Sequence, residues 1–225
     1  PPRHPGSGAS DCHTDVVTSD AVPESAADAR TRRGRPGYDR TGMSAVAVRL
    51  FIEQGYEATS VSDIARRLGL TKSALYHHFS SKEEILAVAL DAALDALEAV
   101  LAEPGAREGA ASERLGFVVR RATGVLVAQL PAVTLLLRVR GNSPVEQAAL
   151  ARRRDFDHRV TRIVADAQAE GDLRDDIDAA VAARLIFGMI NSVVEWYRPS
   201  GDADAAGERL GKNIERLALD GLRTR

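Results

Sequence analysis

The sequence predicts an all-α protein of about nine helices, and three observations support this fold class. Aromatic residues make up only 4% of the 225 residues, and the abundance of Ala, Leu, Val and Arg is typical of packed helices rather than of a β-sandwich. Apolar residues recur with the helical period from Thr41 onward. Glycine and proline interrupt this period where helices would end, and no segment alternates convincingly as a strand does.

Two longer helices frame residues 37–97. The first is expected over 40–54, where the apolar residues share one face, and it ends at Gly55. The other opens at Ser81, a good N-cap whose capping-box partner is Glu84, and it continues with a regular apolar face until Pro104. Because this second helix leaves the N-terminal region, it is expected to link that region to the rest of the chain.

Between them, two short helices form a predicted helix-turn-helix at 60–79. Ser60 and Asp63 make a capping box, Ala65 is a small residue where the helices cross, and Gly69 suits the positive φ of the turn. Thr71 then caps the second short helix, which runs to about residue 78. Both helices offer apolar side chains to a shared core, namely Ile64, Leu68, Leu70 and Leu75.

The remaining chain is predicted to be wholly helical. Helices are expected near 112–128, 131–140, 144–170, 177–197 and 203–221, and the breaks between them contain proline or glycine. The predicted domains are therefore an arm at 1–36, a DNA-binding domain at 37–97 and a ligand-binding and dimerisation domain at 98–225.

The arm at 1–36 is expected to be disordered, because it is rich in Pro, Gly, Ser, Ala and Asp and has no apolar periodicity. It ends in four arginines, Arg30, Arg32, Arg33 and Arg35. Two interpretations stay open at this point. The arm is either a solubilising tail or a segment that lays its guanidinium groups on phosphates or in a minor groove.

Charge is unevenly distributed along the chain, although the net charge is only −2. Residues 30–82 carry ten basic and four acidic residues, whereas 1–29 and 83–225 are both net acidic. A basic module attached to an acidic body is typical of a polyanion-binding protein, and a merely solvated surface is the alternative.

Several classes of protein are disfavoured. A single cysteine, Cys12, excludes an internal disulfide framework and fits a reducing cytoplasm. No phosphate loop, nucleophile elbow, catalytic triad or metal-ligand spacing is present, so we expect no enzyme, no metal and no cofactor. No signal peptide and no membrane span are expected, since the most apolar run, at 125–137, has 13 residues and contains Gln129 and Pro131.

The outward face of the second short helix carries the expected DNA chemistry. Its first-turn amides suit a phosphate, and Lys72 suits a guanine edge or a phosphate. The predicted DNA-binding residues are Ser60, Ser62, Thr71, Lys72, Ser73, Tyr76, His77 and Lys82. Lys82 is included because a cation in the first turn of a helix disfavours that helix unless a phosphate lies nearby. His78 and Phe79 are expected to pack inward, and ordinary surface is the alternative for the Tyr-His-His run.

The stretch TSVSDIARRLGLTKSALYHHF at 59–79, followed by SSKEEIL at 80–86, resembles the DNA-binding head of the TetR family of transcription regulators. The resemblance covers roughly 38–97. It implies a nine-helix fold, a homodimer formed mainly by the last two helices, and an effector pocket in the body. It also implies operator contact by Ser60, Ser62, Lys72, Ser73, Tyr76, His77 and Lys82. The long arm before residue 38 departs from the family pattern.

The helix expected at 177–197 has a broader apolar band than one core face requires, and the last helix adds Leu210, Ile214, Leu217 and Leu219. Surplus apolar surface on two helices suits a four-helix dimer seam, with a deeper monomer core as the alternative. A dimer would read two half-sites of a palindromic operator.

Pocket candidates are the aromatic and polar groups on otherwise aliphatic helices: Phe117, Arg120, Arg138, Phe156, Asn191, Glu195 and Trp196. Each is weighed against an ordinary core or surface role. The segment GMINSVVEWYRPSG at 188–201 resembles a subgroup of TetR-like regulators that respond to acyl-CoA thioesters. An arginine-lined mouth would suit the CoA phosphates and an aliphatic pocket the acyl part. An aromatic helix end that packs on its neighbours is the simpler interpretation.

Together these features predict a cytoplasmic, homodimeric, ligand-responsive repressor that a small molecule releases from its operator. The alternatives are a structural DNA-binding protein that responds to no ligand, and a ligand-binding helical dimer without a DNA function. An acidic helical body of about 120 residues disfavours the first. Lys72 and Lys82 disfavour the second.

Overall fold

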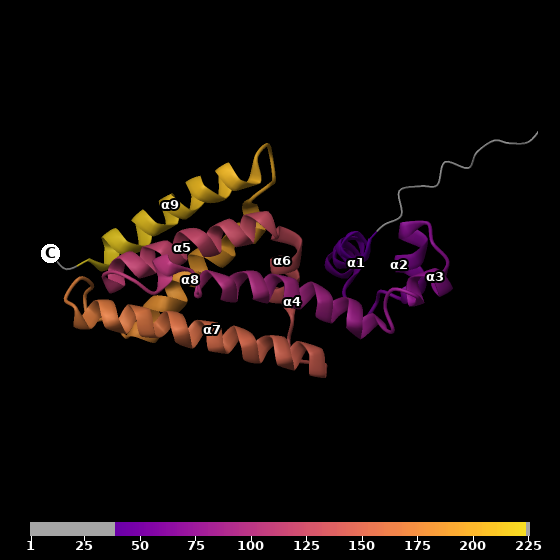
Figure 1. Ribbon diagram of the computed structural model, residues 1–225, viewed down its shortest axis with the longest axis horizontal. Helices are drawn as coiled ribbons and strands as arrows, with labels where there is room; N and C mark the ends of the chain where they lie inside the picture. Colours follow the sequence, from indigo (N-terminus) through magenta and orange to yellow (C-terminus); the bar gives the residue numbers. More distant parts are fainter. Residues whose placement is uncertain (1–38, 224–225) are drawn as a thin grey trace, which may run out of the picture. The chain divides into compact units, whose positions relative to one another are not determined.

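The computed structural model describes residues 39–223, and within them the chain forms nine α-helices and no strand beyond one isolated bridge (Figure 1). The helices are α1 Arg40–Gln54, α2 Val61–Leu68, α3 Lys72–Tyr76, α4 Lys82–Val100, α5 Ala111–Ala128, α6 Leu130–Arg138, α7 Pro144–Ala169, α8 Ala179–Trp196 and α9 Ala203–Leu222, with a short 3₁₀ turn, η1, at Pro104–Ala106. The all-α prediction is therefore confirmed. The arm expected at 1–36 lies outside the described residues.

Helix boundaries follow the predicted signals closely, with two exceptions. The long helix ends at Val100, not at Pro104. Residues 101–103 form a turn and a bend, and the proline begins the separate turn η1. The expected capping box at Ser81 is only half formed. Ser81 accepts the backbone N–H of Glu84, but the Glu84 carboxylate accepts the backbone N–H of Ser80 instead of that of Ser81.

The head consists of α1, α2, α3 and the start of α4, packed on one apolar core. Its largest fully buried side chains are Ile64, Leu75, Phe79, Ile85 and Leu86. Phe51 of α1 is also buried, and it meets the ring of Tyr56 edge to face at 5.1 Å. Since α4 continues without a break from the head into the body, the expected boundary near residue 97 falls inside a helix.

In the body, α5 and α9 lie side by side along most of their length (Figure 1). Glycines allow this close approach. A Cβ added to Gly211 would lie 2.9 Å from the backbone of Arg120, and one added to Gly207 would lie 3.0 Å from the Cα of Gly124. Helices α4, α7 and α8 complete the layer around α5, and α6 leaves α5 at an angle of 100° to cross toward the head.

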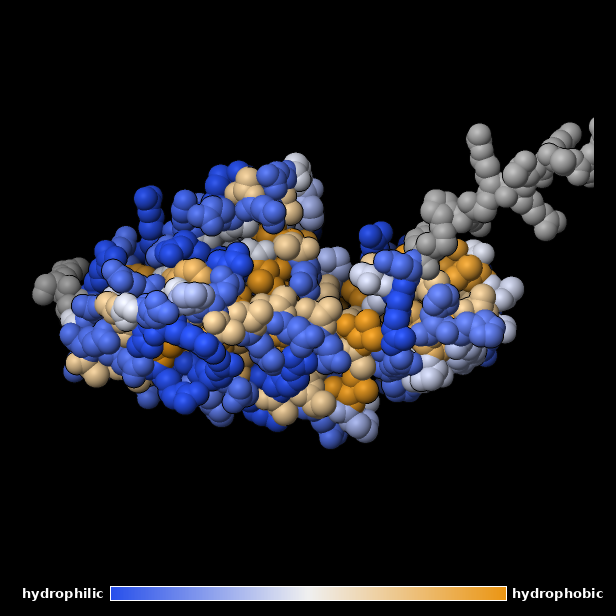
Figure 2. All heavy atoms as spheres, in the orientation of Figure 1, coloured by the Kyte–Doolittle hydropathy of each residue, from blue (hydrophilic) through white to orange (hydrophobic). Residues whose placement is uncertain are grey.

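Apolar side chains that remain exposed are concentrated on two helices. Of the five large ones in residues 39–223, Val181, Leu185 and Trp196 lie on α8 and Leu217 on α9, whereas Tyr76 lies on α3. The face of the body visible in Figure 2 is mainly hydrophilic, with apolar patches between the charged groups. Contiguous exposed apolar patches mark surfaces that bind a partner or a membrane, whereas single exposed apolar side chains are ordinary.

Helix α8 corrects one expectation from the sequence. Its 18 residues have a mean hydropathy of 1.3, so by length and composition it is apolar enough to cross a membrane, and no such segment was expected. One third of the helix is buried inside the fold. This is weak evidence for a span, since a core helix that also carries an apolar outer face has the same composition.

Candidate DNA interface and effector cavity

Local capping holds α2 and α3 in a helix-turn-helix. The Ser60 hydroxyl accepts the N–H of Asp63, and the Asp63 carboxylate accepts the N–H of Ser60, so the predicted capping box is present. Gly69 takes φ 68°, which only glycine adopts without strain, and its N–H closes α2. Thr71 then caps α3 by accepting the N–H of Ala74. These three devices turn the chain between the helices.

Seven of the eight predicted DNA-binding residues are exposed: Ser60, Ser62, Thr71, Lys72, Ser73, Tyr76 and His77. The Thr71 oxygen is used as an acceptor in the cap, which leaves its O–H to donate to a phosphate. Ser60 differs, because its hydroxyl also donates to Asp63 at 2.6 Å. The Lys72 ammonium lies 5.8 Å from the ring of Tyr76, so the two side chains present a cation and a phenol side by side.

Lys82 does not lie on this surface. Only 20% of its side chain is exposed. Its ammonium donates to the backbone carbonyl of Tyr56 at 3.0 Å and lies 4.2 Å from the ring of Tyr56. The lysine thus has intramolecular partners at the start of α4, whereas the sequence interpretation favoured a phosphate partner.

A polar network behind α3, which the sequence interpretation missed, ties it to the rest of the head. The Arg40 guanidinium pairs with Glu84, donates to the backbone carbonyl of His78 at 2.9 Å and stacks over Phe79 at 4.8 Å. Hydrogen bonds from Ser80, together with Arg40, lower the pKa of Glu84 to about 2. Phe79 is buried as expected, but His78 is exposed because its carbonyl, not its ring, faces inward.

The body contains a cavity of about 510 Å³ between α7 and α8, which we call the mouth. Its lining residues are Arg153, Arg154, Asp157, His158, Val160, Thr161, Ala180, Ala183, Arg184, Phe187, Gly188 and Asn191. The three arginines make no hydrogen bond or ion pair within residues 39–223. By contrast, Arg114 and Arg121 elsewhere in the body pair with Asp166 and Glu103. Unpaired guanidinium groups around a cavity suit an anionic ligand.

A smaller apolar cavity of about 40 Å³, the inner chamber, adjoins the mouth. The two cavities share the lining residues Arg153, Asp157, Phe187 and Asn191. The rest of the chamber is lined from α4, α5, α6, α7 and α8 by Leu97, Ala122, Leu126, Val133, Leu136, Leu137, Phe156 and Ile190. A ligand that fills both cavities would therefore have a polar, anionic part and an apolar tail.

Only two of the seven predicted pocket residues line these cavities, Asn191 and Phe156. Phe117 packs on Gly105 of η1, Arg120 pairs with Glu215 of α9, and Arg138 donates to the carbonyl of Ile52. Glu195 and Trp196 are exposed at the end of α8. None of these five side chains lines the mouth or the inner chamber, because side chains on one helix face different neighbours and the sequence does not show which. Arg120 lines a separate cavity with Glu215 and Leu219 of α9.

The sequence interpretation missed the charged residues of the mouth. Burial raises the pKa of the Asp157 carboxyl, although Arg153, His158 and Arg184 act in the opposite direction. Arg153, Asp157 and His158 lie on α7, and the tertiary structure brings Arg184 of α8 to them. The run of three arginines at 152–154 was the signal in the sequence that could have indicated an anion-binding cavity. In the structure Arg153 and Arg154 line the mouth, whereas Arg152 pairs with carboxylates of α4.

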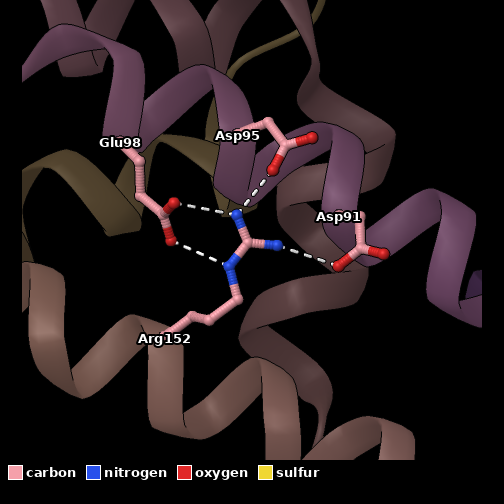
Figure 3. Close-up of polar contacts among 4 residues, drawn as sticks. All are labelled: Asp91, Asp95, Glu98 and Arg152. Atoms are coloured by element: carbon pink, nitrogen blue, oxygen red, sulfur yellow. Dashed lines mark hydrogen bonds and ion pairs between the residues drawn. The ribbon is translucent and has the colours of Figure 1, made fainter. Parts of the chain in front are cut away.

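Arg152, the first of that run, links α7 to α4 (Figure 3). Its guanidinium bonds Asp91 at 2.9 Å, Asp95 at 2.5 Å and both oxygens of Glu98 at 2.8 and 2.9 Å. The three carboxylates lie about one turn apart on one face of α4. Because the neighbouring Arg153 lines the mouth, the same stretch of α7 contacts both the cavity and the helix that enters the head.

Two family models match the chain. One, for bacterial regulatory proteins of the tetR family, covers residues 45–89, and the other, for the tetracyclin repressor-like C-terminal domain, covers 108–222. The second match alone spans about half of the chain. Together they include the helix-turn-helix and every lining residue of the two cavities except Leu97.

Three known proteins illustrate the similarity. The HTH-type transcriptional repressor KstR2 of Rhodococcus jostii is 29% identical over 209 residues, 89% of this chain and 97% of the relative. The crystal structure of SCO3833, a TetR regulator of Streptomyces coelicolor, is 50% identical with a TM-score of 0.77, over 84% of this chain and 92% of that one. The structure of the ketosteroid transcriptional regulator KstR2 of Mycobacterium tuberculosis is 26% identical with a TM-score of 0.73. The match covers 85% of this chain and 98% of that chain.

Proposed function

This chain belongs to the TetR family of bacterial regulatory proteins and is a DNA-binding transcriptional regulator, and we propose that it is a cytoplasmic repressor whose effector is an acyl-CoA thioester. The observation that carries the proposal of this effector is the pair of adjoining cavities, one lined by unpaired arginines and the other apolar. The effector enters the body, and the operator is released from the head.

Operator contact is assigned to the exposed residues of the helix-turn-helix. Lys72 and Tyr76 lie on the outer face of α3, and Thr71 and Ser62 lie at the N-terminal ends of α3 and α2, where backbone amides favour phosphates. Ser73 and His77 extend this surface, and Ser60 contributes once its bond to Asp63 yields to a phosphate. Lys82 is not assigned to DNA, because it is held by Tyr56.

A homodimer through α8 and α9 explains the exposed apolar residues of the body. Val181, Leu185 and Trp196 project from α8 with spacings of one or more turns, and Leu217 on α9 is 73% exposed. Burying them between two copies forms a four-helix seam and removes their contact with water. The resulting two-fold symmetry places two copies of α3 on two half-sites of a palindromic operator.

The mouth and the inner chamber fit the two parts of an acyl-CoA. Three phosphates and a long polar arm need cationic groups and space, which Arg153, Arg154 and Arg184 and the 510 Å³ of the mouth provide. The acyl tail needs an apolar chamber, and the thioester between them would lie near Asp157 and Asn191, the polar residues common to both cavities. This matches the acyl-CoA-responsive subgroup that the end of α8 resembles.

Two helices that line the inner chamber, α6 and α4, also contact or enter the head, so ligand binding in the cavities can move the head. Helix α6 lines the inner chamber, and its last residue, Arg138, donates to the carbonyl of Ile52 in α1 at 3.0 Å. Helix α4 also lines the chamber through Leu97, and it is bound to α7 by Arg152. A ligand that displaces α6 or α4 tilts the heads, so the two α3 helices no longer match the spacing of the half-sites.

The experiment compares coenzyme A, butyryl-CoA, butyrate and the S-butyryl thioester of N-acetylcysteamine in thermal-shift and operator-release assays. The operator is first selected from a pool of random duplexes. We expect butyryl-CoA to stabilise the protein and release DNA, while butyrate and the small thioester act only at much higher concentration. Equal potency of butyryl-CoA and the small thioester would exclude a role for the arginine-lined mouth.

Arg184→Gln and Arg107→Gln form a matched pair for this experiment. Arg184 lines the mouth, whereas Arg107 is an exposed arginine of the same body outside both cavities. Removing one charge-assisted contact to a phosphate weakens binding by about tenfold or more. We expect that loss for Arg184→Gln alone, and the same affinity in both variants would contradict the assignment.

A further inference from the structure

The inner chamber is small for the ligand that the mouth admits. Its volume is about 40 Å³, compared with about 510 Å³ for the mouth. A cavity needs about 10–15 Å³ for each water-sized group, so the chamber holds about three or four heavy atoms. Benzene occupies an engineered cavity of about 150 Å³ in the best-known example, so a ring does not fit here without rearrangement.

Two aromatic rings lie together where the cavities meet, and one of them, Phe187, borders both cavities. Phe156 of α7 and Phe187 of α8 meet edge to face, with ring centroids 5.4 Å apart and an interplanar angle of 79°. Phe187 lines both the mouth and the chamber, whereas Phe156 lines the chamber alone and is only 4% exposed. The two rings therefore occupy the space into which a longer tail would extend.

The other walls of the chamber give a longer tail no easier path. Leu136 and Leu137 belong to α6, which is anchored to the head through Arg138, and Leu97 belongs to α4, which is bound to α7 through Arg152. Moving either helix disturbs those bonds. Rotating Phe187 to admit a longer tail disturbs its packing on the buried core and its edge-to-face contact with Phe156.

We propose that the Phe156–Phe187 pair sets the acyl-chain selectivity of the effector site and restricts it to short acyl groups of about three or four carbons. This inference rests on the proposed function, since it concerns the acyl part of the same ligand. The arginines of the mouth bind any CoA thioester alike. Discrimination between acyl groups comes from the two rings.

The test measures affinity for acetyl-, butyryl-, octanoyl- and palmitoyl-CoA by calorimetry, and for the matching thioesters of N-acetylcysteamine. Wild-type protein is expected to bind butyryl-CoA most tightly, about tenfold more tightly than octanoyl-CoA, since each methylene that is accommodated or refused changes affinity severalfold. Phe187→Ala moves the optimum to octanoyl-CoA. Phe187→Leu, a milder change that keeps the apolar wall, moves it part of the way.

Phe117→Leu is the control, because Phe117 is an aromatic residue of the same domain that packs on Gly105 outside both cavities. It should leave the order of the acyl chains unchanged. Wild-type affinities that are equal for butyryl- and octanoyl-CoA would overturn the inference, as would an unchanged order in Phe187→Ala and Phe187→Leu.

The two thioester series separate this inference from the proposed function. An optimum at butyryl in both series, with no gain from the CoA moiety, would refute the acyl-CoA effector while the selectivity of the chamber stands. Tight CoA binding without dependence on chain length would refute the chamber while the effector class stands. Binding of neither series would refute both.

Discussion

The head and the body of this protein use charged residues in different ways. In the head, Arg40 and Glu84 pair with each other at the surface, and the groups on the outer face of α3, such as Lys72, have no ion-pair partner within residues 39–223. In the body, three arginines without an ion-pair partner in residues 39–223 line a cavity between α7 and α8. The head thus presents this cation on an outer surface, whereas the body places these arginines around a cavity between helices.

Disrupting the proposed dimer should have the largest effect, because it removes the symmetry on which operator binding depends. Leu185→Glu places a charge in the centre of the apolar stripe on α8, where Leu185 is 62% exposed in the monomer. We expect the protein to sediment as a monomer that binds the operator at least about 100-fold more weakly. A folded dimer with normal operator affinity would place the interface elsewhere.

Lys72→Ala tests the exposed surface of the head. Loss of one base or phosphate contact costs about 1–3 kcal/mol, so operator affinity should fall by about tenfold or more in a mobility-shift titration. Lys212→Ala is the control, since Lys212 on α9 pairs only with Glu208 on the surface. If the two variants bind the operator equally well, α3 is not oriented toward DNA as proposed.

Gly69→Ala tests the support beneath that surface. At φ 68° an alanine is strained by about 1–2 kcal/mol, so the free energy of unfolding should fall by that amount in urea titrations. Gly221→Ala is the matched control in α9, where nothing lies within 4 Å of an added Cβ. There alanine should stabilise the helix by up to about 1 kcal/mol. Opposite signs at the two positions are the result that supports the account.

The smallest effect concerns Glu84, whose contacts are at the surface. Its pKa is lowered from 4.5 to about 2 in the folded protein. The carboxylate therefore contributes its full stability above pH 4.5, and the contribution is lost as the pH falls toward 2. The urea concentration at the midpoint of unfolding should fall between pH 6 and pH 3 in the wild type. In Glu84→Gln this fall should be smaller. An identical pH dependence in both would mean that another group is responsible.

The same contrast explains what the sequence could predict. Capping residues, Gly69 and the helical period act within a few residues, so the caps at Ser60 and Thr71 and most helix boundaries agree with the prediction. Contacts between distant helices carry no such local signature. Arg138 and Trp196 were assigned to the pocket although one binds the head and the other faces outward, while Arg184 and Phe187 were missed.

Lys82 shows the limit of a local argument even in the head. A cation at the start of a helix does conflict with the helix dipole, as the sequence interpretation noted. The compensation comes from Tyr56, which lies 26 residues earlier and meets the lysine only in the folded protein. A phosphate was a reasonable partner from the sequence, and the tertiary structure supplies a different one.

The central claim is that a ligand bound in the cavities of the body releases operator DNA from the two heads of the dimer. A titration of operator affinity against ligand occupancy tests it most directly. The operator Kd is measured at increasing butyryl-CoA, while calorimetry gives the occupied fraction of the cavity. We predict that the Kd rises by about tenfold or more in proportion to occupancy. An operator Kd that stays constant while the cavity becomes saturated would contradict the account.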